Sequence, residues 1–341
     1  MLKRILSLLC ALLLAVPVNA YASDIWVSAY SAIAIDSGSG TVFYEKNAYE
    51  ERPMASTTKI MTCLIACESD DLDKTVTISR EMLAGVEGSM LYLKVGDKIT
   101  LLDLIKGAML ASGNDAANAI AFTIGGSVEG FVELMNSRAQ QIGMKNTAFV
   151  TPSGLDEGNH HSTAYDMALL SSVAVENKVF LSICSKSAEE ITVSGVKQKI
   201  YNHNRLLSSD KGFVGVKTGF TEKAGRCLIS AYRYKGNTVI AVTLNAPDDW
   251  QDHARLVEYS KKKYKTHAST ADYEIPLVGS VENKKVLCCA KYSVTCLGDI
   301  EARAYYYPFI YSPVSSGDRV GSLRLYSNGK LIKTVDITVK E

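Results

Sequence analysis

The chain has 341 residues, with 37 basic and 36 acidic side chains and a formal net charge of +1 at pH 7. Charges this evenly balanced exclude the broad positive field by which many proteins attract nucleic acid. The length allows one large folded domain and a smaller one beside it.

The first residues, "MLKRILSLLCALLLAVPVNAYAS", have the pattern of a secretory signal peptide. Lys3 and Arg4 precede an apolar run over 5–16, and Ala20 and Ala22 lie at cleavage spacing. The run is too short to span a bilayer. We therefore predict a signal peptide over 1–22, cleaved after its last residue, and a soluble mature chain outside the cytoplasm. Cleavage removes two basic residues and no acidic one, which leaves 35 basic against 36 acidic.

The first half of the mature chain begins with strands and continues with helices. A hairpin is predicted with strands over 32–35 and 41–44, and a helix after Pro53 with Ser56 at its amino end. Residues 99–122 predict two helical segments that break at 112–114. Residues 126–143 predict an amphipathic helix, whose apolar face consists of Phe131, Leu134, Met135 and Ile142.

The second half returns to strands. A strand is predicted over 212–220, two strands over 225–247 around a Lys-Gly-Asn turn, and a helix over 248–266. The two early strands and these three can form one antiparallel sheet of about five strands, with helices packed on its faces. The predicted fold class of residues 23–268 is therefore α+β.

Residues 269–341 have a different, β-rich character and predict a separate small all-β domain. Asn328-Gly329 lies between alternating strands, which is a strong signal for a type I′ hairpin. The chain ends in "GKLIKTVDITVKE", which predicts a strand. We therefore expect no C-terminal membrane anchor.

Cysteine and histidine patterns give no indication of a metal or cofactor. Eight cysteines become seven after cleavage, and neither a Cys-x-x-Cys pair nor a His-Glu-x-x-His motif occurs. Cys63 and Cys67 lie one helical turn apart and are expected to be buried. A disulfide among Cys288, Cys289 and Cys296 stays open. The pair at 160–161, two histidines, is expected on a surface loop.

Ser56 and Lys59 form a Ser-x-x-Lys motif, which is weak evidence when taken alone because the chain contains five of them. This one differs because it opens an otherwise apolar helix. Residues three apart share a helix face, so Lys59 would be drawn towards the interior, where a lysine can lose its proton near neutral pH and act as a base. The helix amino end would also favour negative charge on the serine.

Two further motifs each occur once. Ser112-Gly113-Asn114 lies at the predicted break between helices, where it would otherwise be an ordinary cap and turn. Lys217-Thr218-Gly219 ends a predicted strand, where it would otherwise be a strand end with a bulge glycine. The three motifs in this order are far more specific than any one of them.

Together these motifs resemble the penicillin-binding proteins and serine β-lactamases. The flanking segments "MASTTKIMT", "LKVGDKITLLDLIKGAMLASGNDAANAIA" and "GVKTGFTEKAGRCLISA" resemble, more narrowly, the low-molecular-weight D-alanyl-D-alanine carboxypeptidases of peptidase family S11. The resemblance extends over about residues 25–265, and the β-rich tail is similar to the C-terminal domain of that family. It implies a β-lactamase/DD-peptidase-like fold with a helical subdomain.

The resemblance also implies catalytic roles. Ser56 would attack the terminal D-Ala–D-Ala bond of a peptidoglycan stem and form an acyl-enzyme, and Lys59 would take its proton. Ser112 would pass a proton to the leaving D-alanine. The backbone N–H groups of Ser56 and Phe220 would form the oxyanion hole.

Four residues would hold the substrate. Asn114 would bind its amide, Lys217 would supply positive charge, Thr218 would bind the terminal carboxylate, and Gly219 would allow close approach to the strand. β-Lactam antibiotics would be covalent inhibitors.

Three alternative functions remain open at this point: a class A-like β-lactamase, a non-catalytic peptidoglycan-binding protein on the same fold, and an endopeptidase acting on crosslinks.

Overall fold

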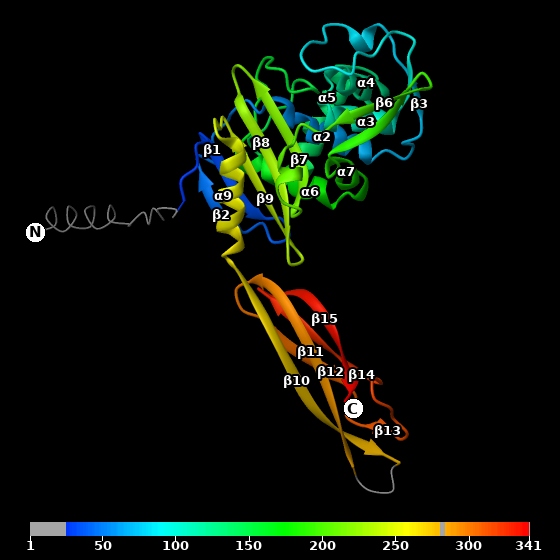
Figure 1. The fold of residues 1–341 in the computed structure, drawn as a ribbon, viewed down its shortest axis with the longest axis vertical. Helices are drawn as coiled ribbons and strands as arrows, with labels where there is room; N and C mark the ends of the chain where they lie inside the picture. Colours follow the sequence, from blue (N-terminus) through cyan, green and yellow to red (C-terminus); the bar gives the residue numbers. More distant parts are fainter. Residues whose placement is uncertain (1–24, 280–283, 341) are drawn as a thin grey trace, which may run out of the picture.

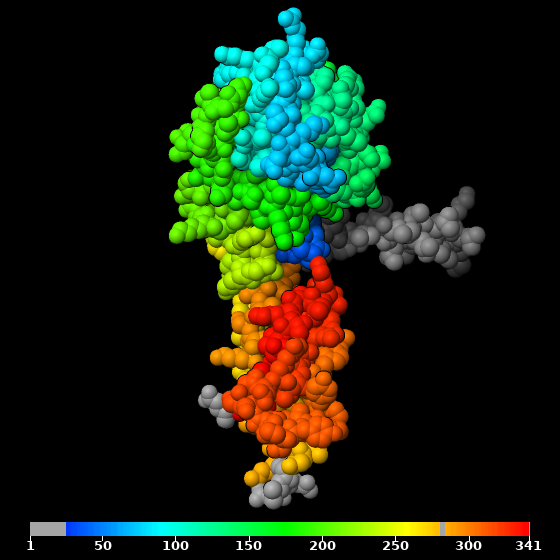
Figure 2. All heavy atoms as spheres, turned by 90° about the vertical axis from the view of Figure 1, so that its right-hand side faces the viewer, coloured from blue at the N-terminus to red at the C-terminus, as the bar shows by residue number. Residues whose placement is uncertain are grey.

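The computed structural model describes residues 25–279 and 284–340, so the predicted signal peptide lies outside the described residues. Figure 1 shows an α+β part followed by a long all-β part. The two are stacked along the longest axis of the molecule, and Figure 2 shows the β part as the narrower one. The predicted fold class is confirmed.

A five-stranded antiparallel sheet forms the centre of the α+β part, in the order β2-β1-β9-β8-β7. The N-terminal hairpin thus pairs with strands from the end of this part, as predicted. The bounds are β1 Ser31–Asp36, β2 Val42–Lys46, β7 Phe213–Thr221, β8 Gly225–Tyr234 and β9 Asn237–Leu244.

Strand β1 is buried on both faces because helices cover the sheet on each side. Ile33 and Ile35 face the main core, which includes side chains of α6 (Ala164–Glu176). Ala32 and Ala34 face a second cluster with α9 (Asp249–Lys261). Side chains alternate across a strand, so one apolar run supplies both layers. Figure 1 shows α9 lying along the strands.

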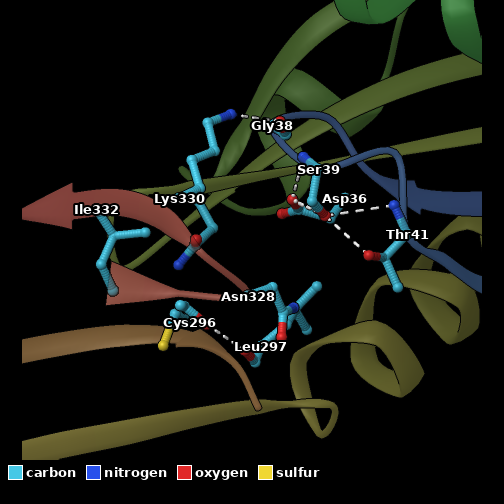
Figure 3. Close-up of a pocket in the computed structure, with 11 residues that line it drawn as sticks. Asp36, Gly38, Ser39, Thr41, Cys296, Leu297, Asn328, Lys330 and Ile332 are labelled. Atoms are coloured by element: carbon cyan, nitrogen blue, oxygen red, sulfur yellow. Dashed lines mark hydrogen bonds between the residues drawn. The ribbon is translucent and has the colours of Figure 1, made fainter. Parts of the chain in front are cut away.

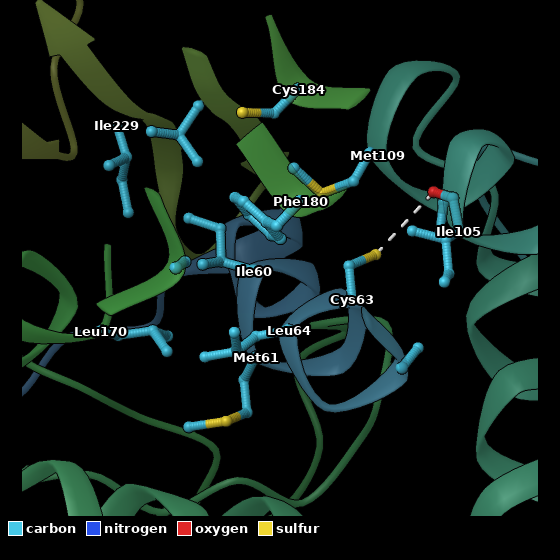
Figure 4. Close-up of a cluster of buried hydrophobic side chains, with 14 of the residues drawn as sticks. Ile60, Met61, Cys63, Leu64, Ile105, Met109, Leu170, Phe180, Cys184 and Ile229 are labelled. Atoms are coloured by element: carbon cyan, nitrogen blue, oxygen red, sulfur yellow. Dashed lines mark hydrogen bonds between the residues drawn. The ribbon is translucent and has the colours of Figure 1, made fainter. Parts of the chain in front are cut away.

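The helical subdomain packs around α2 (Lys59–Cys67), which continues a 3₁₀ turn, η1 (Ala55–Thr58). Figure 4 shows the apolar side chains of α2, among them Ile60, in this core. Around them lie α3 Leu101–Leu110, α4 Asn114–Gly125, α5 Val128–Ile142 and α7 Lys178–Cys184. Cys63 and Cys67 are buried here, as predicted.

The buried face of helix α5 differs from the predicted one at Leu134. Phe131, Met135 and Ala139 are buried, whereas Leu134 is 41% exposed. The helix lies on the surface, so one stripe reaches the core, with Val132 and Ile142 partly buried beside it. Neighbouring Leu134 is turned towards solvent.

Smaller elements complete this part. Strands β3 (Thr75–Thr77) and β4 (Lys98–Thr100) pair, as do β5 (Ala188–Val193) and β6 (Val196–Tyr201). Neither pair was expected from the sequence, and β4 includes residues 99–100, which were predicted to be helical. The strands of the first pair are three residues long, and most side chains of β6 are exposed. The short turns are η2 Glu81–Leu83 and α8 Leu206–Ser209.

The all-β part begins directly after α9, which ends at Lys261 and not at the predicted 266. Its six strands are ordered β12-β14-β15-β11-β10-β13. Asn328 and Gly329 have φ angles of 49° and 75°, as a type I′ turn requires. The bounds are β10 Tyr264–Val278, β11 Lys285–Leu297, β12 Glu301–Tyr306, β13 Ile310–Tyr311, β14 Arg319–Ser327 and β15 Lys330–Val339.

Polar contacts join the two parts around a cavity of about 420 Å³, shown in Figure 3. Lys330 Nζ donates to the Gly38 carbonyl at 3.0 Å, from the β14–β15 turn to the β1–β2 turn. The Tyr264 hydroxyl donates to Asp36 at 2.5 Å. The β part is therefore joined to the end of the sheet at which the β1–β2 turn lies.

The cysteines and the helices of the described residues bear on two further expectations. All seven cysteines in them are free, so the disulfide left open among Cys288, Cys289 and Cys296 is not formed. Within the same residues, no single helix has the length and apolar character needed to cross a membrane. The pair α6 and α7 meets that criterion only jointly and is bent by 103°.

Candidate active site

Ser56 lies in a tight turn that the neighbouring loop holds in place. Ala55, directly before it, has a φ of 49°, a left-handed conformation that costs energy for a residue with a Cβ. The Thr57 hydroxyl donates to the Met54 carbonyl at 2.6 Å and closes the turn. Gly154 packs against it so closely that a Cβ there would lie 2.0 Å from the Ala55 carbonyl oxygen. The structure therefore fixes the position of Ser56 from two sides.

Lys59 is fully buried and reaches back to Ser56. Its Nζ lies 2.9 Å from Ser56 Oγ, 2.6 Å from Asn114 Oδ1 and 2.7 Å from the Ser153 carbonyl oxygen. A neutral amine has two N–H donors and one lone pair. With the two N–H groups donated to Asn114 and Ser153, the lone pair is left for the proton of Ser56. This is the arrangement that a general base requires.

Burial favours that neutral form. It holds the pKa of Lys59 well below the usual value of 10.5, and the positive charge of Lys217 lowers the pKa further. Burial likewise lowers the pKa of Lys217, to about 8. Two lysines inside one protein core thus supply a base beside a cation.

Ser112 and Asn114 project from the link between α3 and α4, as predicted for a break between helices. Ser112 has a φ of 59° and lines the same cavity as Ser56. Asn114 Nδ2 donates to the Glu87 carbonyl at 2.6 Å, while its Oδ1 accepts from Lys59. Asn114, which was expected to bind the substrate amide, therefore also fixes the position of Lys59.

The Lys-Thr-Gly segment lies on β7, at the free edge of the sheet. Lys217 is buried and donates to the Thr218 carbonyl at 3.0 Å. A Cβ on Gly219 would lie 3.0 Å from the backbone nitrogens of Ser56 and Thr57. Glycine thus lets β7 approach the turn that holds Ser56.

A cavity of about 520 Å³ connects these groups. Ser56, Ser112, Thr218, Gly219 and Phe220 line it, so the three motifs meet in one place. Arg205 lines it as well, and none of the remaining lining residues was expected from the sequence. Those are Ser89, His203, Arg226, Cys227, Asp249 and Trp250. They stand in no short motif, so only the fold brings them together.

His160 is buried, which corrects the expectation that it lies on a surface loop. Its Nδ1 accepts from the Val150 backbone N–H at 2.9 Å, so the neutral ring carries its proton on Nε2, 2.8 Å from the Thr58 hydroxyl. Burial lowers the pKa of His160 to about 4. The ring ties the 150–160 loop to the turn beside Ser56. Nothing in the local sequence distinguishes such a histidine from an exposed one.

No cluster of three histidine, cysteine or acidic side chains that could hold a metal ion occurs within 25–279 and 284–340. The reactive groups that the site presents are a serine hydroxyl with an adjacent buried amine, a second serine, and N–H donors along a strand edge. This set is suited to acyl transfer through a covalent serine ester.

Comparison with known proteins gives consistent results. The family model for D-alanyl-D-alanine carboxypeptidase, peptidase family S11, matches residues 18–248. The chain is 30% identical to D-alanyl-D-alanine carboxypeptidase DacF of Bacillus subtilis, covering 94% of this chain and 87% of that protein. It is 32% identical to DacC of Escherichia coli, covering 92% and 84%.

Solved structures show the same similarity. The Streptomyces K15 DD-transpeptidase superposes with a TM-score of 0.66 at 33% identity, covering 69% of this chain and 97% of that one. The D-alanyl-D-alanine carboxypeptidase DacD from Francisella tularensis superposes with a TM-score of 0.64 at 25% identity, covering 94% of each chain. The family model matches well over half of the chain, so the chain belongs to the D-alanyl-D-alanine carboxypeptidase family, peptidase family S11.

Proposed function

We propose that this chain is a serine DD-carboxypeptidase that removes the terminal D-alanine from peptidoglycan pentapeptide stems. The observation that carries the proposal is the 2.9 Å contact between the buried amine of Lys59 and the Ser56 hydroxyl. It lies in one cavity with Ser112 and the edge of β7. The likeness to DacF and DacC supports the substrate class.

In the proposed reaction, Lys59 takes the proton of Ser56 as Oγ attacks the carbonyl carbon of the penultimate D-alanine. The N–H groups of Ser56 and Phe220 stabilise the negative oxygen; losing one such donor typically costs about 10²–10³ in rate. The C–N bond then breaks, and Ser112 passes a proton to the leaving nitrogen. Water attacks the ester, gives its proton back through the same groups, and frees the shortened stem and Ser56.

Recognition would come from β7. The Thr218 hydroxyl binds the terminal carboxylate, and the buried cation of Lys217 stabilises negative charge beside it. Asn114 holds Lys59 in place and reaches the substrate amide at the same time. Penicillin carries a reactive amide and a carboxylate, so it would acylate Ser56 as well.

The β-lactamase alternative needs fast deacylation, commonly from an extra carboxylate near the ester. Asp249 is the one acidic side chain among the described residues that line the cavity, and it is paired with Arg226 at 2.6 Å. A carboxylate held in that ion pair is a poor base for activating water. This favours the carboxypeptidase.

The predicted signal peptide supports a site of action outside the cytoplasm, on cell-wall material. The decisive experiment measures D-alanine released from a pentapeptide stem by residues 23–341, beside Ser56→Ala. Release by the wild type alone supports the proposal. Rapid penicillin turnover without D-alanine release would favour the β-lactamase, and cleavage of crosslinked dimers in place of pentapeptide would favour an endopeptidase. Intact folding with neither acylation nor cleavage would favour a non-catalytic binding protein.

A further inference from the structure

The proposed reaction leaves several residues that line the active-site cavity unexplained. Arg226, Asp249 and Trp250 line it from the start of β8 and the first turn of α9, and Arg205, directly before α8, lines it as well. None of these four belongs to the three motifs. Charged side chains in a substrate cavity that chemistry does not use are candidates for substrate recognition.

Arg226 is held firmly in place. Its guanidinium donates to Asp249 at 2.6 Å and lies over the Trp250 ring, 5.7 Å from the ring centre. Asp249 is buried, with 5% of its side chain exposed, whereas 45% of the Arg226 side chain remains exposed. Guanidinium has five N–H donors in a fixed fork. One edge is anchored on a buried carboxylate, and further donors remain for a ligand.

The charged side chains that line the cavity are mostly basic. Arg205 is exposed and forms no ion pair with any residue in the described part of the chain. Asp249 is the one acidic side chain among the described lining residues, and it is already paired with Arg226. A planar carboxylate matches the remaining donors of an arginine fork.

The direction of the bound stem places such a group. In the proposed reaction the terminal carboxylate lies at Thr218 and the scissile carbonyl at the N–H of Phe220. The stem therefore continues along β7 past Phe220, away from its terminus. Phe220 is paired directly with Arg226 across the hairpin, and residues two apart on a strand are separated by about 7 Å. The residue before the two D-alanines would therefore lie near Arg226.

We propose that Arg226, assisted by Arg205, forms a subsite for a carboxylate on the side chain of the stem residue that precedes D-Ala–D-Ala. The inference rests on the proposed function and names its substrate class: stems whose third residue is a diamino acid bearing a side-chain carboxylate, in preference to stems with a bare side-chain amine. Asp249 and Trp250 act as positioning residues for the guanidinium.

Two pentapeptides test this directly, because lysine and meso-diaminopimelate at the third position differ by one carboxylate. The wild type should show a kcat/KM for the diaminopimelate stem that is about ten- to hundredfold higher, as a charge-assisted hydrogen bond supplies. Arg226→Gln should bring that ratio towards one, and Arg205→Gln should lower it less. The matched control is Arg138→Gln, which breaks an ion pair of the same 2.6 Å length on α5 and should leave the ratio unchanged.

Arg226→Gln leaves Asp249 buried without its cation, so the double variant Arg226→Gln/Asp249→Asn is measured too, with thermal unfolding of each. It should keep the fold and show the same loss of preference. Equal cleavage of both stems by the wild type, or equal slowing of both by Arg226→Gln, would overturn the subsite. Failure of the wild type to cleave either stem or to react with penicillin would instead overturn the proposed function, and this inference with it.

Discussion

His253 should make the α+β part lose stability as the pH falls. The ring is fully buried in α9, with Nδ1 2.6 Å from the Ser230 hydroxyl and Nε2 3.0 Å from the Thr243 hydroxyl. Burial lowers the pKa of His253 from 6.5 to about 3. His160 is in the same situation, with its pKa lowered to about 4. Both rings are therefore neutral in the folded protein at mildly acidic pH.

The sign follows from which state binds the proton. Above pH 6.5 both rings are neutral in either state, and the pH has no effect through them. Below it, the unfolded chain takes up protons that the folded chain refuses, so the free energy of unfolding decreases as the pH falls. The slope is about 1.4 kcal/mol per pH unit for each histidine. Between pH 6.5 and about 5, each ring should therefore cost about 2 kcal/mol, a large part of the roughly 5–15 kcal/mol that stabilises a typical domain.

Urea unfolding at several pH values measures this slope. The chain has two tryptophans, Trp26 and Trp250, both in the α+β part, so their fluorescence reports that part alone. His253→Gln should reduce the slope by about 1.4 kcal/mol per pH unit. Ser230→Ala is the control: it removes a hydrogen bond but keeps the ring, so stability should fall while the slope remains. An unchanged slope in His253→Gln would refute the reasoning.

Two other predictions concern the active site. Gly154→Ala should abolish penicillin acylation, because its φ of +86° and the 2.0 Å approach to the Ala55 carbonyl leave no room for a Cβ. The control is Gly143→Ala, which has a φ of +90° and open space around it and should be acylated normally. Equal loss of acylation in both variants would contradict a steric cause. The acylation rate should rise with pH through the lowered pKa of Lys59 and then level off, because only the neutral amine accepts a proton. Lys217→Gln removes a positive charge, so it should move the rising limb to higher pH; a limb that stays in place or moves lower would count against Lys59 as the base.

Much of the fold could be predicted because its signals are local or periodic. The central strands of the five-stranded sheet are short apolar runs, and Asn328-Gly329 encodes its own turn. The three motifs were recognisable because each joins chemically specialised residues at short spacing. The structure brings all three to one cavity.

The remaining features depend on contacts between distant residues, and no local pattern encodes those. Asn114 meets Lys59 across 55 positions, and His160 meets Thr58 across 102. Arg226 and Asp249 form their ion pair only because α9 begins beside β8. Strand β6 has a single buried side chain and lacks the apolar alternation by which strands are predicted.

The central claim is that Ser56 is the nucleophile activated by Lys59. The most direct measurement is the intact mass of residues 23–341 after incubation with penicillin, for the wild type and for Ser56→Ala, followed by peptide mapping of any adduct. The account predicts one penicilloyl group on the wild type, attached to Ser56, and none on the variant. An adduct that persists in Ser56→Ala, or well-folded wild type that gains no mass under conditions where any ester would be retained, would contradict it.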